Sequence, residues 1–382
     1  MKTLSDYYAA DFPSGVFLPE YPSSTNRRAR FVNRERFLIH DPVPPPEDRL
    51  VNVLGPHHLL SVWGGALAAA PGVPPPHALT AHWRERLGTG LRMDGKAEGR
   101  PYITLFPLEA LADAEHAVDP NAHYELLSKE AIPKIDCPQP SAVPRGRYPC
   151  MLKISHGYSS LGNYVLRSGD DDDRVSALLA QRWPGARVVR TELIREIRDD
   201  YCAQFYLSKA GVVDWLGVTG QLFDAGGRWD GAQVYCERQE VLQRDLDPVV
   251  RPVAVHLHRH GYAGVVGVDV VRDGAGQLWV VDLNPRINGS TPLLLISKAM
   301  GRRGWSSGWY APSRRFRGSV GELLAAAGKL SPGEIVVLSC AAEEPGPFTA
   351  CHLAAFGESQ ADCRELMERL LASGDGEGNS RS

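Results

Sequence analysis

The stretch Gly264–Pro292 decides the fold, and it reads GVVGVDVVRDGAGQLWVVDLNPRINGSTP. Two runs rich in β-branched residues flank the sequence Arg-Asp-Gly-Ala-Gly, whose Asp-Gly pair favours a β-hairpin turn. Asp282 and Asn284 are two residues apart and therefore project from one face of the second strand. If the connecting loop has an even number of residues, Asp269 on the first strand faces the same side. It then lies within roughly 7–8 Å of them as a cross-strand or diagonal neighbour.

Two carboxylates and an amide oxygen that converge on one face need a cation, and hard oxygen ligands favour Mg²⁺ or Mn²⁺. The alternative is an ordinary exposed hairpin with solvated acids. Single acids on strands are common, but D-x12-D followed by L-N-P-R-x-N-G-S is not. We therefore predict a metal site at Asp269, Asp282 and Asn284, with Arg286 beside it on a loop opened by Pro285.

The order Gly-Val-Asp, hairpin, Asp-Leu-Asn-Pro-Arg resembles the metal-binding end of the ATP-grasp ligases, many of which have glutamate at the place of Asp282. The resemblance covers about 165 residues, Lys129 to Ile296. It implies an α/β (α+β) ATP-grasp fold with an N-terminal pre-grasp α/β domain and a small C-terminal α+β domain. It also implies an ATP-dependent ligase that uses ATP and Mg²⁺ (or Mn²⁺). Such an enzyme activates a carboxylate as an acyl phosphate and joins it to an amine or thiol, releasing ADP and phosphate, with Arg286 as the catalytic group.

Composition excludes several other classes of protein. The 382 residues are 43% hydrophobic and 23% charged, with a net charge of −3, which gives no support for nucleic-acid or membrane partners. The apolar runs are too short to span a bilayer, and MKTLSDYYAADFPSG lacks the apolar core of a secretory signal. The seven cysteines are scattered, which predicts reduced thiols and a cytoplasmic location.

The first domain, predicted over residues 1–123, contains many Pro and Gly breakers. Its pattern predicts a buried strand over 49–55, followed by a helix that begins near His57 and His58. These histidines either line a ligand cleft or simply begin the helix, and we favour the second interpretation. A short strand over 101–109 and a helix over 110–117 complete the predicted domain.

A lysine and a Gly-Ser loop predict where phosphate binds. Lys153 lies on the predicted strand YPCMLKIS, directly before the loop HGYSSLGNYVL, whose glycines allow close backbone approach and whose hydroxyls and amides can hold phosphate oxygens. Lys129, on the amphipathic helical turn YELLSKEAIP, matches the second nucleotide lysine of the family. The predicted ATP-phosphate residues are Lys129, Lys153, Gly157, Ser159, Ser160 and Gly162.

The segment 186–197 is predicted to be a strand that passes into a connection. The resemblance implies that the backbone of Glu192, Leu193 and Ile194 forms the hinge that binds adenine. The family's G-x-E after the hinge is absent here, so either Asp200 or Gln204 would bind the ribose.

The helices that follow show clear end signals. The four aspartates 170–173 suit the N-cap and first turn of a helix rather than a metal cluster. The pattern at 246–261 predicts a helix with Asp247 as N-cap and Pro248 at its first position. His256 and His260 are spaced for zinc, but a third ligand is lacking nearby, so we favour helix-end histidines.

Two segments after the hairpin carry functional predictions. Backbone amides at the helix start after the hairpin would hold an anion such as a substrate carboxylate or γ-phosphate, which assigns Asn288, Gly289 and Ser290 to substrate binding. The aromatic and basic segment 302–318 is predicted to be mobile over the site or a link to the last domain, which shows an αββα pattern. The predicted units after the first are 124–190, 191–316, 317–373 and a disordered tail, 374–382.

Within the family, Asp-x-Asn-Pro-Arg-x-Asn-Gly-Ser with the added C-terminal unit resembles the pheganomycin-type peptide ligases of bacterial natural-product biosynthesis. That resemblance implies small-molecule carboxylate and amine substrates, of amino-acid or peptide type, and is compatible with a homodimer. The alternatives are an ATP-grasp ligase of primary metabolism and a non-catalytic nucleotide-binding relative. A transport protein that binds substrate is a third alternative, and the missing signal argues against it.

Overall fold

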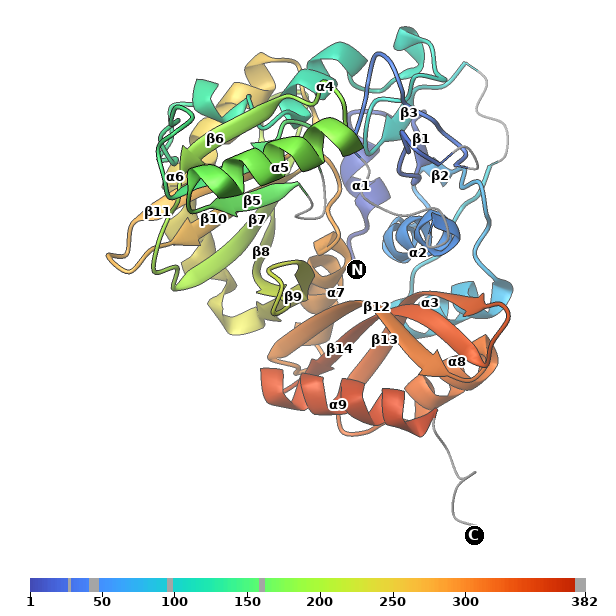
Figure 1. Cartoon of the computed structure of the whole chain (residues 1–382). Helices are drawn as coiled ribbons and strands as arrows, with labels where there is room; N and C mark the ends of the chain where they lie inside the picture. The colour runs from blue at the N-terminus through green and yellow to red at the C-terminus, as the bar shows by residue number, and fades with distance from the viewer. Residues whose placement is uncertain (27–28, 41–47, 95–98, 158–161, 375–382) are drawn as a thin grey trace.

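A computed structural model of the chain describes residues 1–26, 29–40, 48–94, 99–157 and 162–374. Its helices and strands form one large sheet, two small sheets and the helices that cover them (Figure 1). Among the described residues, no helix is both long and apolar enough to cross a membrane.

The N-terminal part is built on a small parallel sheet in the order β2-β1-β3. Stacking of Phe17 on Trp63, with ring centroids 4.2 Å apart, anchors its core. Its elements are α1 (Leu4–Tyr8), β1 (Val16–Leu18), α2 (Asp48–Leu60), β2 (Ala68–Ala69), α3 (His77–Leu87), β3 (Tyr102–Thr104) and the 3₁₀ turn Asp113–Glu115.

Two predictions for this part were wrong. Residues 49–55 belong to α2 rather than to a strand, and Pro56 lies inside that helix. A short apolar run does not distinguish a strand from a buried helix by its period alone, and packing of α2 on β13, β14 and α7 decides it here. The helix predicted over 110–117 is only the 3₁₀ turn, whereas the strand predicted over 101–109 is confirmed as β3.

The helix predicted to carry Lys129 ends before it. Helix α4 (Pro120–Leu127) begins at the N-cap Asp119, whose carboxylate accepts hydrogen bonds from two backbone amides. Lys129 follows in the turn that the Ala131 N–H closes on the Ser128 carbonyl, and its own backbone N–H donates to the Ser155 carbonyl at 2.8 Å. The short 3₁₀ turn Ile132–Lys134 comes next.

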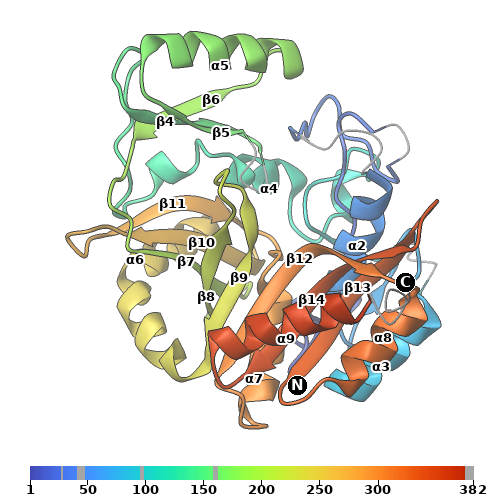
Figure 2. The ribbon, with the colours of Figure 1, turned by 60° about the horizontal axis from the view of Figure 1, so that its bottom comes forward.

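The second small sheet is antiparallel, in the order β5-β4-β6, and helix α5 covers it (Figures 1 and 2). Its elements are β4 (Cys150–Ile154), β5 (Asn163–Leu166), α5 (Gly169–Arg182) and β6 (Val188–Glu192). Ser168 caps α5, and the aspartates lie in its first turns as predicted. Asp172 is buried there and accepts hydrogen bonds from Arg190 and Tyr148, both at 2.8 Å, so it serves the structure of this sheet.

The large sheet has eight strands in the order β11-β10-β7-β8-β9-β12-β14-β13. Its strands are β7 (Asp199–Leu207), β8 (Val213–Phe223), β9 (Trp229–Tyr235), β10 (Gly264–Arg272), β11 (Leu278–Asn284), β12 (Ser307–Arg317), β13 (Glu334–Glu343) and β14 (Phe348–Gly357). The helical elements beside it are the 3₁₀ turn Cys236–Arg238, α6 (Gln239–Arg259), α7 (Thr291–Gly301), α8 (Val320–Lys329) and α9 (Gln360–Ser373).

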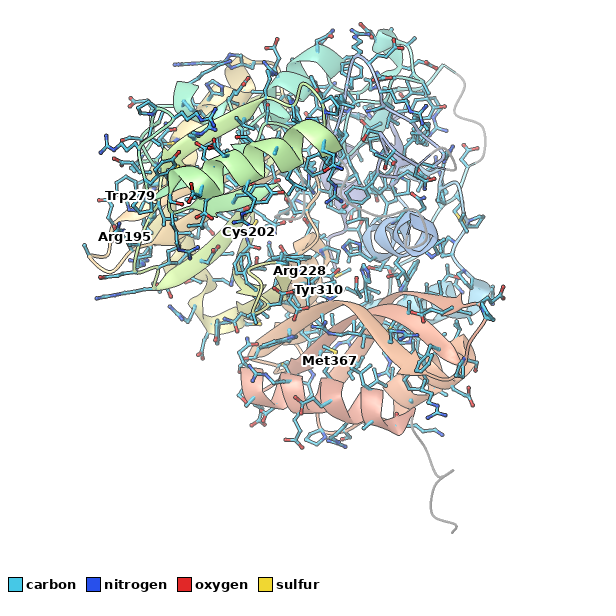
Figure 3. The ribbon with its side chains drawn as sticks, in the orientation of Figure 1. Arg195, Cys202, Arg228, Trp279, Tyr310 and Met367 are labelled. Atoms are coloured by element: carbon cyan, nitrogen blue, oxygen red, sulfur yellow. The ribbon has the colours of Figure 1, made fainter. Side chains whose placement is uncertain are left out.

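Segment 302–318 is mostly strand β12 and connects α7 to the αββα unit, which agrees with the predicted link to the last domain rather than with a mobile segment. The strand pairs with β9 on one side and β14 on the other, so it joins the two halves of the sheet. Its side chains alternate: Trp309 faces α9, where Arg364 lies over its ring, and Tyr310 is buried from the other side. Figure 3 shows Tyr310 and Met367 of α9 on opposite sides of this part of the sheet. The αββα pattern of α8, β13, β14 and α9 is confirmed.

Helix α6 begins eight residues before its predicted N-cap, so that prediction was wrong. It runs from Gln239 to Arg259, with Pro248 and Pro252 inside it. Leu242 and Leu246 extend its buried stripe toward the N-terminus, and this burial overrides the local stop-and-start signal. Asp247 pairs with Arg251 one turn on, at 2.8 and 2.9 Å.

The hairpin of β10 and β11 is confirmed, but its register arises differently from the expectation. Arg272 pairs with Leu278, so the connection Asp273–Gln277 has an odd number of residues. A β-bulge then shifts the pairing, because Val270 pairs with Val280 whereas Asp269 pairs with Asp282. Val281 is the extra residue, and it restores the common face that the odd loop would have removed.

The junction of β9 and β12 supplies a stability prediction. Gly231 has φ +139°, and a Cβ there would collide with the Tyr310 carbonyl oxygen. Gly227 also has a positive φ, +74°, but open space around it. We expect Gly231→Ala to lower the free energy of unfolding by about 1–3 kcal/mol more than Gly227→Ala does, because it adds a backbone collision to the conformational cost. Denaturant titration of both variants measures this difference, and equal losses would contradict the close approach.

Candidate active site

A cavity of about 1350 Å³ opens between the small antiparallel sheet, α2 and one face of the large sheet. The predicted site residues that line it are Lys129, Lys153, Gly157, Glu192, Leu193, Ile194, Asp200, Asp269, Asp282, Asn284, Arg286, Asn288, Gly289 and Ser290. Segments more than 150 residues apart in the chain thus contribute to one cavity. Ser159 and Ser160 lie outside the described residues.

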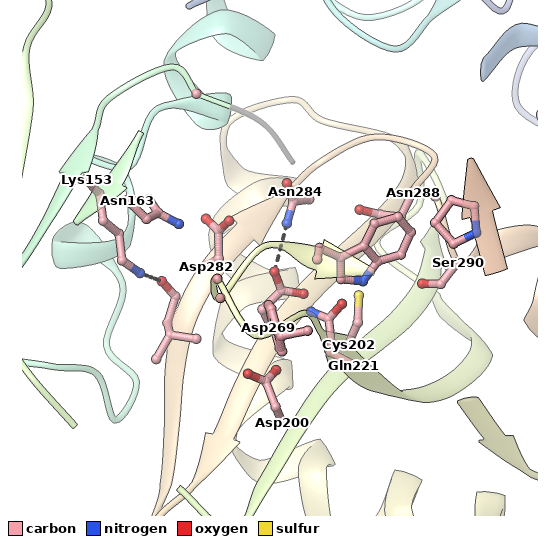
Figure 4. A pocket seen from close by; sticks show the side chains of 18 of the residues that line it. Lys153, Asn163, Asp200, Cys202, Gln221, Asp269, Asp282, Asn284, Asn288 and Ser290 are labelled. Carbon is pink, nitrogen blue, oxygen red and sulfur yellow. Dashed lines mark hydrogen bonds between the residues drawn. The ribbon is translucent and has the colours of Figure 1, made fainter. Parts of the chain in front are cut away.

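The predicted metal ligands lie on adjacent strands and face one another (Figure 4). Asn284 Nδ2 donates to Asp269 Oδ2 at 3.3 Å, and the Lys129 ammonium donates to Asp282 Oδ1. A positive group therefore already sits at these carboxylates. Among the described residues, no group of three or more His, Cys, Asp and Glu side chains is placed to hold a metal. Two carboxylates with one amide oxygen nevertheless form the hard oxygen set that suits Mg²⁺ with water or phosphate completing its shell.

The charges of this cluster are strongly coupled. Burial, and then the neighbouring Asp282 carboxylate, raise the pKa of Asp269 to about 6. Burial also acts to raise the pKa of Asp282, but the ammonium groups of Lys129 and Lys153 hold it below its usual value. The cluster therefore repels a second buried negative charge and favours a cation, which is the condition a metal site requires.

Lys153 is tied to the bulge of β11. Its ammonium donates to the Val281 carbonyl at 2.6 Å, as drawn in Figure 4. Burial lowers the pKa of Lys153, while Asp282 acts to raise it. Lys153 therefore reaches from the small sheet across the cavity to the hairpin, and its position beside the carboxylates suits a phosphate oxygen.

Gly162 directly precedes strand β5, at a position where the structure requires glycine. Gly162 has φ +88°, and a Cβ there would lie 2.6 Å from the Ile154 side chain. Gly157, which precedes residues 158–161, lines the cavity and forms an isolated bridge with His40.

The loop after the hairpin is held by its own side chains. Arg286 donates to Asn284 Oδ1 at 3.2 Å, and its guanidinium lies over the Phe106 ring. Asn288 Nδ2 donates to the Arg286 carbonyl at 2.8 Å, and its side chain occupies the space left by Gly267. Arg286 is therefore held at the edge of the carboxylate cluster.

The Ser290 side chain serves the packing of this loop rather than an open site. Its hydroxyl is buried and accepts hydrogen bonds from Gln204 at 2.8 Å and Thr219 at 3.3 Å. Gln204 is fully buried, and its carbonyl oxygen accepts from Thr291 at 2.6 Å. The alternative that Gln204 binds ribose is therefore wrong, because both ends of its amide are used inside the protein.

The hinge residues Glu192, Leu193 and Ile194 line the cavity between the two sheets. Asp200 lies beyond them on β7, beside Val271 of β10 and below Asp269 in Figure 4. Burial, and then the Asp269 carboxylate, raise the pKa of Asp200 to about 7, against the effect of Lys153. A ribose hydroxyl would supply the hydrogen bonds that such a carboxyl needs.

Further cavity residues were missed by the sequence analysis or assigned no chemistry. Cys202 lies beside Asp269 in the β7–β10 pairing. Others line the end of the cavity beyond Arg286: His58, Trp229, Tyr310, Arg314 and His352. His58 lies within α2 and not at a helix start, so its cavity role replaces the interpretation we favoured.

Comparison with known proteins gives the class first. The ADP complex of an N5-carboxyaminoimidazole ribonucleotide synthetase aligns with a TM-score of 0.55 at 12% identity, over 93% of this chain and 95% of that chain. The Staphylococcus aureus N5-carboxyaminoimidazole synthetase complexed with ADP gives 0.54 at 9%, over 94% and 98%. Rhizobium etli pyruvate carboxylase gives 0.52 at 12% and covers 79% of this chain, which spans only 30% of that protein. The chain has the ATP-grasp fold.

The particular family model that matches is described as L-aspartate–L-methionine ligase, ATP grasp, over residues 138–284. The matched segment is an ATP-grasp domain. It contains Lys153, the hinge and all three predicted metal ligands, and Lys129 lies before it.

The raised pKa of Asp200 gives a pH prediction. A carboxyl whose pKa is higher in the folded state than its usual 3.8 stabilises the fold below that value, and this stabilisation is lost as pH rises through about 7. Asp200→Asn removes the cost of a buried charge, so we expect its melting temperature, relative to wild type, to rise by several degrees between pH 5 and pH 8. Asp199→Asn, at the adjacent position beside Arg272, serves as the control. A difference that does not change with pH would contradict the buried, uncharged carboxyl.

Proposed function

We propose that the protein is an ATP-dependent, ADP-forming ligase that joins a carboxylate to an amine. The observation that carries this proposal is the convergence of Asp269, Asp282 and Asn284 with two lysines and Arg286 in one cavity of an ATP-grasp fold. A cavity with so many charged groups has no evident role in packing. Its groups match the needs of phosphoryl transfer, which are positioning and stabilisation of charge.

Nucleotide would bind between the small antiparallel sheet and the large sheet. Adenine would lie against the hinge backbone of Glu192, Leu193 and Ile194, and Asp200 would accept from the ribose hydroxyls. Lys153 would leave the Val281 carbonyl and bind a phosphate oxygen. Lys129 would leave Asp282 and bind another phosphate oxygen. Gly157, Ser159, Ser160 and Gly162 complete the proposed phosphate loop.

The acid cluster would hold the metal that accompanies ATP. Bound Mg²⁺ (or Mn²⁺) at Asp269, Asp282 and Asn284 would neutralise charge on the β- and γ-phosphates. The cluster fits that role because its Asp282 carboxylate already binds the ammonium of Lys129. Lys129 would therefore balance the charge of the site before nucleotide binds.

The reaction would proceed in two balanced steps. A carboxylate oxygen of the first substrate attacks the γ-phosphorus of ATP, which forms an acyl phosphate as the bond to ADP breaks. The neutral amine then attacks the acyl carbon, phosphate leaves, and the amine nitrogen loses a proton as the amide forms. Arg286, held by Asn284 at the edge of the cluster, would stabilise negative charge on the transferring phosphoryl group or the tetrahedral intermediate.

The substrates are proposed to be small molecules of amino-acid or peptide type. The matched family model, named for a ligase of two amino acids, supports this choice. Gly289 and Ser290 would bind substrate through their backbone amides at the start of α7, beside Asn288, whose own amide donates to Thr291 Oγ1. Natural-product biosynthesis of the pheganomycin type, a homodimer and a cytoplasmic location remain part of the proposal. Seven cysteines without a disulfide among them suit a reducing compartment.

Release of ADP and phosphate from ATP, measured with a panel of amino-acid and peptide pairs, tests the function. We expect Arg286→Met to lower kcat by on the order of 100- to 1,000-fold, because one preorganised charge contact with the transition state is lost. Asp282→Asn should have a comparable effect and should weaken the response to Mg²⁺, and chelation of the metal should abolish turnover.

Asp247→Asn, which removes an exposed ion pair on α6, is the control. It should leave kcat and the response to Mg²⁺ unchanged. Nucleotide binding without pair-dependent ADP release would favour the non-catalytic alternative. Turnover only with a purine-pathway or other primary-metabolism pair would favour an ATP-grasp ligase of primary metabolism.

A further inference from the structure

The cavity continues past Arg286 into an end with a different chemistry. Four rings line it: His58 of α2, Trp229 of β9, Tyr310 of β12 and His352 of β14. We call this group the aromatic compartment. Its members come from positions far apart in the chain, and the site proposed for ATP and metal uses none of them.

The rings of the aromatic compartment pack against one another. The Tyr310 ring lies 5.8 Å from both Trp229 and His58, and it is nearly parallel to His58, at 13°. His58 and His352 are 5.4 Å apart. Tyr310 and His58 are buried in this cluster, whereas Trp229 and His352 are partly accessible and present ring surface of the kind that packs against apolar, aromatic or thioether groups.

Hydrogen bonds fix these rings in place. The two ring nitrogens of His58 lie 2.8 Å from the Gly55 carbonyl and 3.0 Å from the Gly289 carbonyl, and the neutral ring donates its single N–H to one of them. The Tyr310 hydroxyl lies 3.0 Å from His352 Nδ1. A rigid apolar wall costs little entropy when a ligand binds, which is a property of binding sites as well as of cores.

The aromatic compartment adjoins the loop next to the proposed reaction centre. Trp229 packs on Gly289, because a Cβ at Gly289 would lie 2.9 Å from the Trp229 ring. His58 Nε2 contacts the carbonyl oxygen of Gly289. Gly289 is three residues from Arg286. A substrate that reacts beside Arg286 would therefore place its side chain among these rings.

The charges at this end are already balanced. Arg314, the cation beside the rings, forms two contacts of 2.9 Å with the Asp230 carboxylate. Burial lowers the pKa of His58, and it lowers the pKa of His352 well below its usual value, so both imidazoles are neutral near pH 7. A charged side chain placed among these rings would lose its hydration, and the nearby Arg314 already has its partner in Asp230.

The size of the cavity leaves room for such a group. Sites for one drug-sized ligand occupy about 300–1,000 Å³, whereas this cavity measures about 1350 Å³. The excess volume suits a second ligand beside the nucleotide.

We propose that the aromatic compartment binds an uncharged apolar, aromatic or thioether side chain of one of the two amino-acid substrates. This inference rests on the proposed function and names the substrate class of that site. The same side-chain chemistry can come from the carboxylate donor or from the amine, and blocked amino acids distinguish these two sources.

Calorimetric titration of the full chain with MgADP present tests the inference without turnover. The probes are L-phenylalaninamide and L-norleucinamide, which can only occupy an amine position, and N-acetyl-L-phenylalanine and N-acetyl-L-norleucine, which can only occupy a carboxylate position. L-Lysinamide and N-acetyl-L-glutamate are the charged counterparts. We expect the two probes with uncharged side chains at one of these positions to bind roughly tenfold or more tightly than the probe with a charged side chain at the same position.

Variants localise the binding. Trp229→Ala should weaken the neutral probe roughly tenfold or more, because a ring face is lost. His352→Gln, which keeps a polar partner for Tyr310, should weaken it as well and guards against poor folding of the first variant. Trp309→Ala is the matched control, because this ring lies beside Tyr310 in sequence but faces α9 and Arg364, and it should leave binding unchanged.

Three outcomes would overturn the inference: charged probes that bind as tightly as neutral ones, neutral probes that fail to bind, or equal effects of the Trp229 and Trp309 variants. Failure of the proposed function has a different signature. In that case the neutral probes bind and respond to Trp229→Ala, but no carboxylate–amine pair releases ADP.

Discussion

The β-bulge at Val281 is the constraint on which the site depends. With an odd five-residue connection, unbroken pairing would place Val281 opposite Asp269 and turn Asp282 and Asn284 to the other face. One extra residue reverses this and brings both carboxylates together. The bulge also leaves the Val281 carbonyl free to accept from Lys153 of the small sheet. A single irregularity therefore sets both the acid cluster and the resting position of the lysine that faces it.

Electrostatics suits this site to the cation and nucleotide that we propose for it. Asp269 and Asp282 are held close together, and burial, followed by the repulsion of Asp282, raises the pKa of Asp269 to about 6. Lys129 relieves part of that repulsion. The ammonium groups and the carboxylates thus neutralise one another. With a metal–triphosphate complex bound, the carboxylates would bind the metal and the ammonium groups would bind phosphate oxygens. Beyond them the lining turns aromatic and neutral, so one cavity combines two chemistries.

Local patterns in the sequence predicted much of the machinery. Strand alternation, the Asp-Gly turn and the spacing of Asp282 and Asn284 act over a few residues, and the fold respects them. The failures have tertiary causes. Residues 49–55 fold as a helix because α2 packs on β13. Helix α6 begins earlier than predicted because Leu242, in its first turns, is buried. The bulge left no sequence signal that we recognised, because loop length alone implied the wrong face. The aromatic compartment gathers residues 58, 229, 310 and 352, whose proximity only the folded chain reveals.

The central claim is that Asp269, Asp282 and Asn284 hold a divalent metal where Lys129 now sits. A crystal structure of the full chain grown with Mn²⁺ and ADP, with anomalous scattering recorded for manganese, tests it most directly. We expect an anomalous peak within bonding distance of Asp269 and Asp282, with the Lys129 ammonium moved from Asp282 toward the nucleotide. Bound ADP with manganese elsewhere, or with Lys129 still paired to Asp282 and no metal beside it, would contradict the account.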